Sequence, residues 1–260
     1  MIAIVAAMRD EVANFLDAGG YRESERHGAV RLYTTTRWPE VAVVIGGVGR
    51  ERAEVATLVA IRRCNPDVIV SAGFAGGVVP GFSVGDVVLC DEVLTIDGHT
   101  AGVLHKNTGN GVSNSLFALE DSPQRVGCLT VKDMAATSEV KRSIGDRFPV
   151  AVADMESYWV AEVAAQAGVK SVVVRCVLDP VERTLPALVS DLIGSGAAAR
   201  FLRSLVHVAT RPGSIPDLLR LARETATAKK ALARVLESIA STPWPRVETE
   251  NAIGTDYARR

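Results

Sequence analysis

The chain has 260 residues, a formal net charge of -1 and 48% hydrophobic residues. This length suits one large α/β domain with an appended helical piece, and it is enough to bury a substantial core. The mixed charge shows no basic footprint, so we expect a small-molecule ligand and no nucleic-acid partner. The four cysteines lack paired spacing, which indicates reduced thiols in a cytoplasmic protein.

The first eight residues are apolar and run directly into Arg9-Asp10-Glu11. Because a basic leader is missing, we expect a first strand there and no cleaved signal peptide. Residues 68–85 form a long uncharged run, but glycines and prolines interrupt it. We therefore expect strand, loop and strand in this region, and no transmembrane segment.

Strands and helices are expected to alternate along most of the chain. Strands are predicted at residues 1–7, 31–36, 41–45, 68–71, 86–90 and 125–131, and helices at 12–19, 50–63 and 138–148. Residues 72–77 are rich in glycine and are expected to end a strand in a loop, and 97–114 are expected to form a loop over the site. The pattern predicts a three-layer α/β sandwich with a mixed, mostly parallel central sheet.

The stretch from residue 150 to 180 predicts a strand, a helix that Gly168 ends, and a second strand. We interpret it as a right-handed crossover unit, which places the residues at the two strand ends side by side in a ligand crevice. These residues are Asp154, Glu156, Arg175 and Asp179. Asp154 can also cap the helix and Glu156 can favour its first turn, so both have a structural explanation. Asp179 lies at the mouth of a buried strand.

The C-terminal region changes character. Residues 185–208 look helical, 211–213 break the pattern, and 215–239 predict a long amphipathic helix or a helix pair. We expect a catalytic domain over 1–190, a helical extension packed on it over 191–241, and a loose tail over 242–260. The extension could instead close a dimer or rest on a membrane surface. Packing on its own domain is the favoured interpretation.

Three further patterns in the sequence are weaker. Gly46-Gly47-Val48-Gly49 before a helix could bind an anion, although a tight turn explains these glycines equally well and no dinucleotide fingerprint follows. His99 and His105 lack acidic or cysteine neighbours at ligand spacing, so no metal site is expected. Met134 and Phe74 could line a pocket for a base, or belong to the core.

Four motifs together carry a family resemblance. They are residues 8–12 (MRDEV), 71–77 (SAGFAGG), 152–156 (VADME) and 174–179 (VRCVLD). In this order and spacing they resemble the purine nucleoside phosphorylase and nucleosidase superfamily, over roughly residues 1 to 190. The first motif is most similar to methylthioadenosine/S-adenosylhomocysteine nucleosidases. Residues 154–157, 179–186 and 211–223 resemble the hopanoid-associated branch.

The resemblance implies a role for each candidate residue. Glu11 would orient or deprotonate the attacking water, Glu156 would bind the ribose, and Asp179 would protonate or hydrogen-bond the departing purine. Met155 would pack beneath the sugar, Arg175 would orient Asp179 or its loop, and the backbone at Ala75 and Gly76 would approach the nucleoside. The resemblance also implies a homodimer and no cofactor, with phosphate as a co-substrate only in a phosphorylase.

We therefore predict a purine nucleosidase that hydrolyses an N-glycosidic bond and releases adenine, with an adenosylhopane-like nucleoside as substrate. Phe74 and Leu178 stand where the nucleosidases have serines, and these apolar residues could favour a lipid-like substituent. The alternatives are a methylthioadenosine/S-adenosylhomocysteine nucleosidase, a phosphorylase whose phosphate contacts Arg9, Arg50 or Arg52, and a non-catalytic nucleoside-binding protein. The presence of Glu11, Glu156 and Asp179 together argues against a bare binding protein.

Overall fold

The computed structural model describes residues 1–101, 123–183 and 215–242. The helix predicted over 185–208, the tail and most of the loop after residue 101 lie outside the described residues. In the described part, ten strands form one mixed sheet. They are β1 (Ile2–Ala6), β2 (Arg22–His27), β3 (Val30–Thr34), β4 (Val41–Ile45), β5 (Val68–Gly77), β6 (Val87–Thr95), β7 (Thr100–Ala101), β8 (Gln124–Thr130), β9 (Val152–Asp154) and β10 (Lys170–Asp179).

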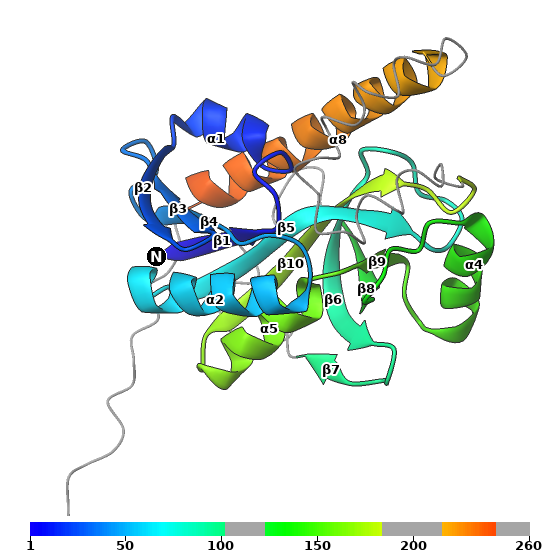
Figure 1. Cartoon of the computed structure of the whole chain (residues 1–260), viewed down its shortest axis with the longest axis horizontal. Helices are drawn as coiled ribbons and strands as arrows, with labels where there is room; N and C mark the ends of the chain where they lie inside the picture. The colour runs from blue at the N-terminus through cyan, green and yellow to red at the C-terminus, as the bar shows by residue number, and fades with distance from the viewer. Residues whose placement is uncertain (102–122, 184–214, 243–260) are drawn as a thin grey trace, which may run out of the picture.

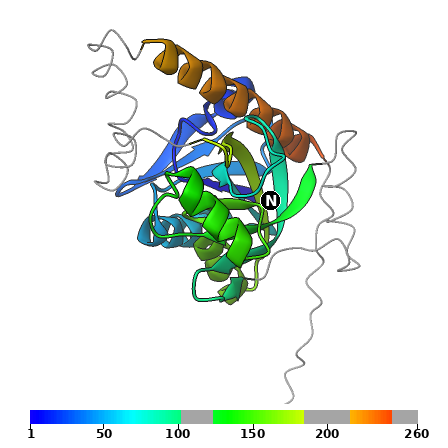
Figure 2. The ribbon, with the colours of Figure 1, turned by 90° about the vertical axis from the view of Figure 1, so that its right-hand side faces the viewer.

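The described helices cover the sheet on two sides. They are α1 (Ala13–Gly19), α2 (Arg50–Cys64), α4 (Ser138–Arg147), α5 (Ser157–Gln166) and α8 (Ile215–Ser241). Helices α1 and α8 lie on one side, α2 and α5 lie on the other, and α4 stands at one end (Figures 1 and 2). The predicted three-layer α/β architecture with a mixed sheet is confirmed.

Part of the sheet closes on itself. The strand order is β10-β6-β8-β9-β5-β1-β4-β3-β2, and β10 also pairs with β5. The five strands β5, β10, β6, β8 and β9 therefore form a ring, which has no free edge. The central strands β1, β4 and β5 pair in parallel. β1 and β4 consist entirely of buried aliphatic residues, as expected for strands covered on both faces.

The ring overturns the predicted crossover. Strand β9 runs antiparallel to β5, whereas β10 runs parallel to β5, so β9 and β10 point in opposite directions and do not pair. The two strand ends are therefore not neighbours in one parallel sheet. The apolar pattern predicted both strands correctly, but the pairing partners of a strand depend on contacts far apart in the sequence.

Strand β5 is longer than the sequence indicated. A loop was predicted at residues 72–77, but the strand continues to Gly77 because β10 pairs along one edge and β9 along the other. The polar strand β2 was missed, since its sequence RESERH has no apolar alternation. It forms because β3 supplies backbone partners for an otherwise exposed edge strand.

Helix α8 belongs to the main core. Ala228, Leu232, Leu236 and Ile239 are buried in one hydrophobic cluster with residues of β1, β4, β5 and α1. Lys229 also forms an ion pair with Asp10, next to the Glu11 loop. The buried face of this helix, over the part whose side chains are described, packs on its own domain. None of the described helices is long and apolar enough to span a membrane.

Candidate active site

Glu11 is held against the middle of β5. It lies in the turn between β1 and α1, and its side chain is buried. Its Oε2 accepts a hydrogen bond from the Met8 amide at 2.8 Å, and its Oε1 accepts one from the Phe74 amide at 3.1 Å. A Cβ at Gly73 would lie 2.9 Å from Oε1, so the carboxylate needs a glycine at this position. Burial raises the pKa of Glu11, and the two amides oppose that shift.

Asp154 and Arg175 form the buried centre of the site. The Arg175 Nε and Nη2 atoms donate to Asp154 Oδ2 at 2.8 and 2.7 Å. The same oxygen accepts from the amide of Ser157 at 3.0 Å and from its hydroxyl at 2.6 Å, so Asp154 does accept from the first turn of α5, although the N-cap residue itself is Glu156. Arg175 also donates to the carbonyl and the hydroxyl of Ser71, at 2.9 and 2.8 Å. All the polar groups of this network are therefore paired.

This network corrects one prediction. Arg175 was expected to orient Asp179 or its loop, but its hydrogen-bond partners are Asp154, Ser71 and the carbonyl of Val174. The partner of Asp179 is Lys141 of α4, which sequence reasoning missed. The sequence of α4 is mostly polar, and no local signal separates its one buried lysine from its exposed charged residues.

Glu156 reaches the glycine loop before α2. It stands at the start of α5, and its Oε1 accepts a hydrogen bond from the Gly49 amide at 2.8 Å. Gly49 has a φ of 91°, a conformation that favours glycine. An amide of this loop therefore does donate to a carboxyl group, but the group is a side chain of the protein itself. Burial, reinforced by Asp154 and Glu11, raises the pKa of Glu156 to about 8.

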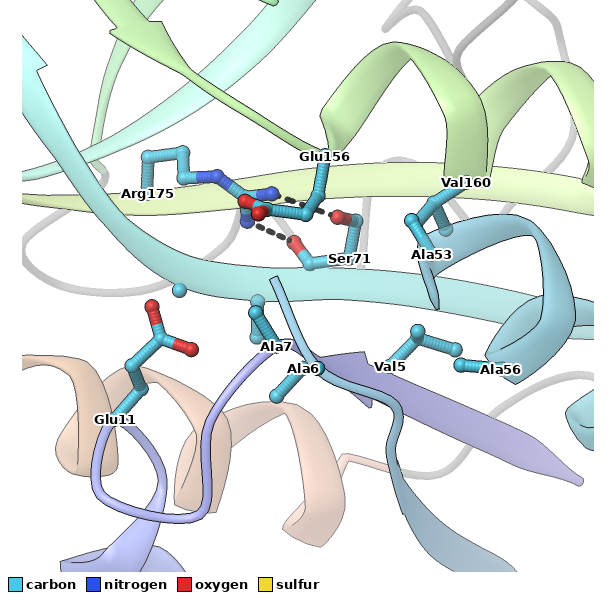
Figure 3. A pocket seen from close by; sticks show the side chains of 13 residues that line it. Val5, Ala6, Ala7, Glu11, Ala53, Ala56, Ser71, Glu156, Val160 and Arg175 are labelled. Atoms are coloured by element: carbon cyan, nitrogen blue, oxygen red, sulfur yellow. Dashed lines mark hydrogen bonds between the residues drawn. The ribbon is translucent and has the colours of Figure 1, made fainter. Parts of the chain in front are cut away.

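Glu11, Glu156 and Arg175 line one enclosed cavity (Figure 3). Its volume is about 10 Å³, which is the room that one ordered water requires. Ser71 is the fourth polar residue of the lining, and all the remaining lining residues are alanine, valine or glycine. Among these lining residues two carboxylic acids face a single cation, and Asp154 already pairs with that cation. Because the Asp154–Arg175 pair is neutral, ionisation of either Glu11 or Glu156 makes the cavity electronegative, and in that state it suits a group that gains positive charge.

Asp179 lies further along the same pair of strands. Arg175 is opposite Gly73 in the β5–β10 register, and Asp179 is opposite Gly76, which is about 10 Å along the strand. A β-bulge between Val177 and Asp179 breaks the register and turns the carboxylate toward α4. Burial raises the pKa of Asp179, and Lys141 opposes that shift. Asp179 is not part of the enclosed cavity.

The remaining predicted residues surround this strand pair. Ala75 is buried, Gly76 pairs with Asp179, and Met155 packs against a cluster that includes Leu129. Phe74 and Leu178 pack against the core cluster that contains α8, so that contact explains their apolar character. Met134 is half-buried in the segment between β8 and α4. These residues, Phe74, Ala75, Gly76, Met134 and Met155, do not line the enclosed cavity.

The arginines considered for phosphate have other partners. Arg9 pairs with Asp17 at the surface, and Arg50 pairs with Glu54 and stacks on Trp159. The stem of Arg52 lies against Gly47. None of the three is a lining residue of the cavity. Within the described ranges, no group of three His, Cys, Asp or Glu residues could hold a metal ion.

The fold and the site define a family. Residues 1–207 match the model of the phosphorylase superfamily, and the chain belongs to that family. Enzymes of this family break N-glycosidic bonds by hydrolysis or phosphorolysis, and its nucleosidases need no cofactor. This protein is therefore an enzyme of nucleoside N-glycosidic bonds.

Solved structures share the fold at low identity. Futalosine hydrolase of Helicobacter pylori is 15% identical and has a TM-score of 0.66, with 92% of this chain and 96% of that chain covered. The 5'-methylthioadenosine/S-adenosylhomocysteine nucleosidase of S. pneumoniae, bound to a transition-state inhibitor, is 19% identical with a TM-score of 0.65, covering 93% and 98%. Arabidopsis thaliana 5'-methylthioadenosine nucleosidase is 21% identical with a TM-score of 0.66, covering 93% and 96%.

Proposed function

We propose that the protein is a purine nucleosidase that hydrolyses the N-glycosidic bond and releases adenine. The observation that carries this proposal is the enclosed cavity, where Glu11 and Glu156 face one arginine in a space that fits a water. Glycosidic cleavage develops positive charge on the sugar, and an electronegative cavity stabilises that charge. A phosphate dianion would meet two carboxylic acids there, which disfavours phosphorolysis.

Each acid has a separate part in the proposed reaction. The bond between C1′ and the purine nitrogen breaks, and its electron pair moves into the purine. Asp179 stabilises the departing base by donating a proton or a hydrogen bond to it. Glu156 binds the ribose hydroxyls. Water forms the new bond at C1′, and Glu11 accepts its proton, so hydrolysis yields free sugar and free base.

The finer substrate proposal is an adenosine with a large apolar, hopanoid-like group on its sugar. Its support is the resemblance of residues 154–157, 179–186 and 211–223 to the hopanoid-associated branch. Phe74 and Leu178 no longer add to that support, because their packing against the α8 cluster explains them. Methylthioadenosine and S-adenosylhomocysteine are the competing substrates, as the names of the similar nucleosidases suggest.

Adenine release tests the proposal. The purified protein is incubated with adenosine, methylthioadenosine, S-adenosylhomocysteine and a 5'-alkyl adenosine, each with and without phosphate. Release without phosphate is the expected result, and the best substrate identifies the substituent. Strict phosphate dependence would establish a phosphorylase instead, and no release from any nucleoside would leave a binding protein. Glu11→Gln is the matched control, since it retains the shape of the side chain and removes its basicity.

Two association proposals accompany this function: the first rests on the family resemblance, and the second on the amphipathic C-terminal region and the lipid-like substrate. We propose a homodimer, which sedimentation at micromolar concentration tests directly, with a monomer as the contradicting result. A peripheral membrane contact would bring a lipid-like substrate to the site, and flotation with liposomes tests it. The buried face of α8 is engaged by its own core, so such a contact would have to use another surface.

A further inference from the structure

Lys141 is buried to an unusual degree for a lysine. Its relative exposure is 0%, while Glu139, Val140, Arg142 and Ser143 beside it on α4 are not buried. A lysine usually keeps its ammonium in water and buries only its stem. Burial of the charged group is costly unless acceptors surround it. The position of this side chain therefore requires specific partners.

The ammonium of Lys141 has three such partners. It forms an ion pair with Asp179 Oδ2, and it donates to the carbonyl oxygens of Pro180 and Arg183 at 3.0 and 2.8 Å. Three N–H donors thus meet three acceptors, which is the full capacity of an ammonium group. All three acceptors belong to the end of β10 and the turn that follows it. Lys141 fixes this turn together with the carboxylate.

The other oxygen of Asp179 remains free. Its Oδ1 is buried and has no hydrogen-bond partner among the described residues. Buried polar atoms in native proteins nearly always have a partner, so an unpaired one at an active site indicates where a ligand binds. A purine ring nitrogen supplies such a partner: it accepts from Oδ1 while the carboxyl group carries the proton, and its N–H donates to Oδ1 once the proton has transferred.

A second ionic contact joins the turn at residues 180–183 to α8. Arg183 donates two hydrogen bonds to Glu224 of α8, at 2.6 and 2.5 Å. Lys141, Arg183 and Glu224 are the charged groups that act on Asp179, and Glu182 also acts on Lys141. The turn at residues 180–183 is therefore clamped between α4 and α8 by two ionic contacts.

We infer that Lys141 positions Asp179, the residue that acts on the leaving purine base. Lys141 holds Asp179 by Oδ2 so that Oδ1 faces the departing purine. This inference rests on the proposed nucleosidase reaction and adds to it a residue outside the three carboxylic acids. Lys141 acts through Asp179 and does not itself contact the substrate. A buried lysine that only stabilises the turn would have a different experimental signature.

A double-mutant cycle separates the two roles. Turnover is measured for the wild type, Lys141→Met, Asp179→Asn and the double variant, with the best purine substrate at saturation. If Lys141 acts through Asp179, its single variant loses at least ~10-fold, and the double variant is within ~3-fold of Asp179→Asn alone. If Lys141 has a separate structural role, the two losses multiply. Multiplied losses would overturn the inference.

Lys229→Met is the matched control, because it removes another lysine–aspartate ion pair at a different place, on α8. Its effect should multiply with that of Asp179→Asn. Lys141→Arg keeps the positive charge and guards against a variant that does not fold, and thermal melting reports the folded fraction of each variant.

A 4-nitrophenyl riboside gives a second measurement, since its leaving group departs without protonation. Lys141→Met should lose less than ~3-fold on this substrate if the residue acts on the leaving purine. Equal losses on both substrates would contradict the inference. A wild type that releases no base from any nucleoside would instead defeat the proposed function, so the two failures are distinguishable.

Discussion

The Arg175 guanidinium and the Asp154 carboxylate form an ion pair in which both residues are at most 5% exposed. Asp154 thereby cancels the charge of Arg175, and Glu11 and Glu156 determine the electrostatic character of the cavity. The pair also joins β10 to the start of α5, since Asp154 accepts from Ser157. The position of Glu156, the proposed ribose ligand, thus depends on the ion pair between Asp154 and Arg175, which is not expected to contact the substrate.

Arg175→Met should be strongly destabilising. The variant leaves Asp154 buried without its cation, and the loss of one partner of a buried pair costs about 3–5 kcal/mol in the free energy of unfolding. Urea denaturation measures this change. The control Arg26→Met removes an arginine of an exposed pair and should change stability by less than ~0.5 kcal/mol. A loss below ~1 kcal/mol for Arg175→Met would contradict the assigned role.

Gly73→Ala should impair turnover without unfolding the protein. The new Cβ would lie 2.9 Å from Glu11 Oε1, so the carboxylate must move. A displacement of this size at a reacting group costs about 100-fold in rate. Gly77→Ala is the matched control in the same strand, because its Cβ would meet its neighbours at 3.6 Å or more, which is ordinary contact. Equal activities of the two variants would exclude this account.

The stability of Glu156→Gln relative to the wild type should increase as the pH rises. The pKa of Glu156 is raised from 4.5 to about 8, so between these values the folded protein binds a proton that the unfolded chain has released. The folded state of the wild type therefore loses stability across that window, and the neutral glutamine does not. The Tm difference between variant and wild type should increase by at least about 3 °C from pH 5 to pH 8.5. Glu40→Gln, at an exposed position, should show no such trend.

Asp179→Asn should lower turnover by at least ~100-fold, since an amide cannot supply the proton that the departing purine requires. Release of adenine under saturating substrate measures the effect. Asp17→Asn, which alters an exposed carboxylate, serves as the control and should leave turnover unchanged. Near-normal turnover of Asp179→Asn would remove this residue from its proposed role.

The sequence by itself determined the elements and the acids. Apolar runs and their turn residues predicted most strands and helices within a few positions, because these signals are local. Glu11, Glu156 and Asp179 could be selected because each is an ionisable residue at or near the end of a strand. Their grouping came from a resemblance that the family match now supports.

Only the tertiary structure decided how these acids are paired. The direction of β9, the continuation of β5 to Gly77 and the assignment of Arg175 to Asp154 all follow from closure of the five-strand ring. Lys141 is distant in sequence from Asp179, and its helix is otherwise polar, so no local pattern could reveal their contact. Burial and electrostatic pairing depend on which segments meet in space, and that is a property of the whole fold.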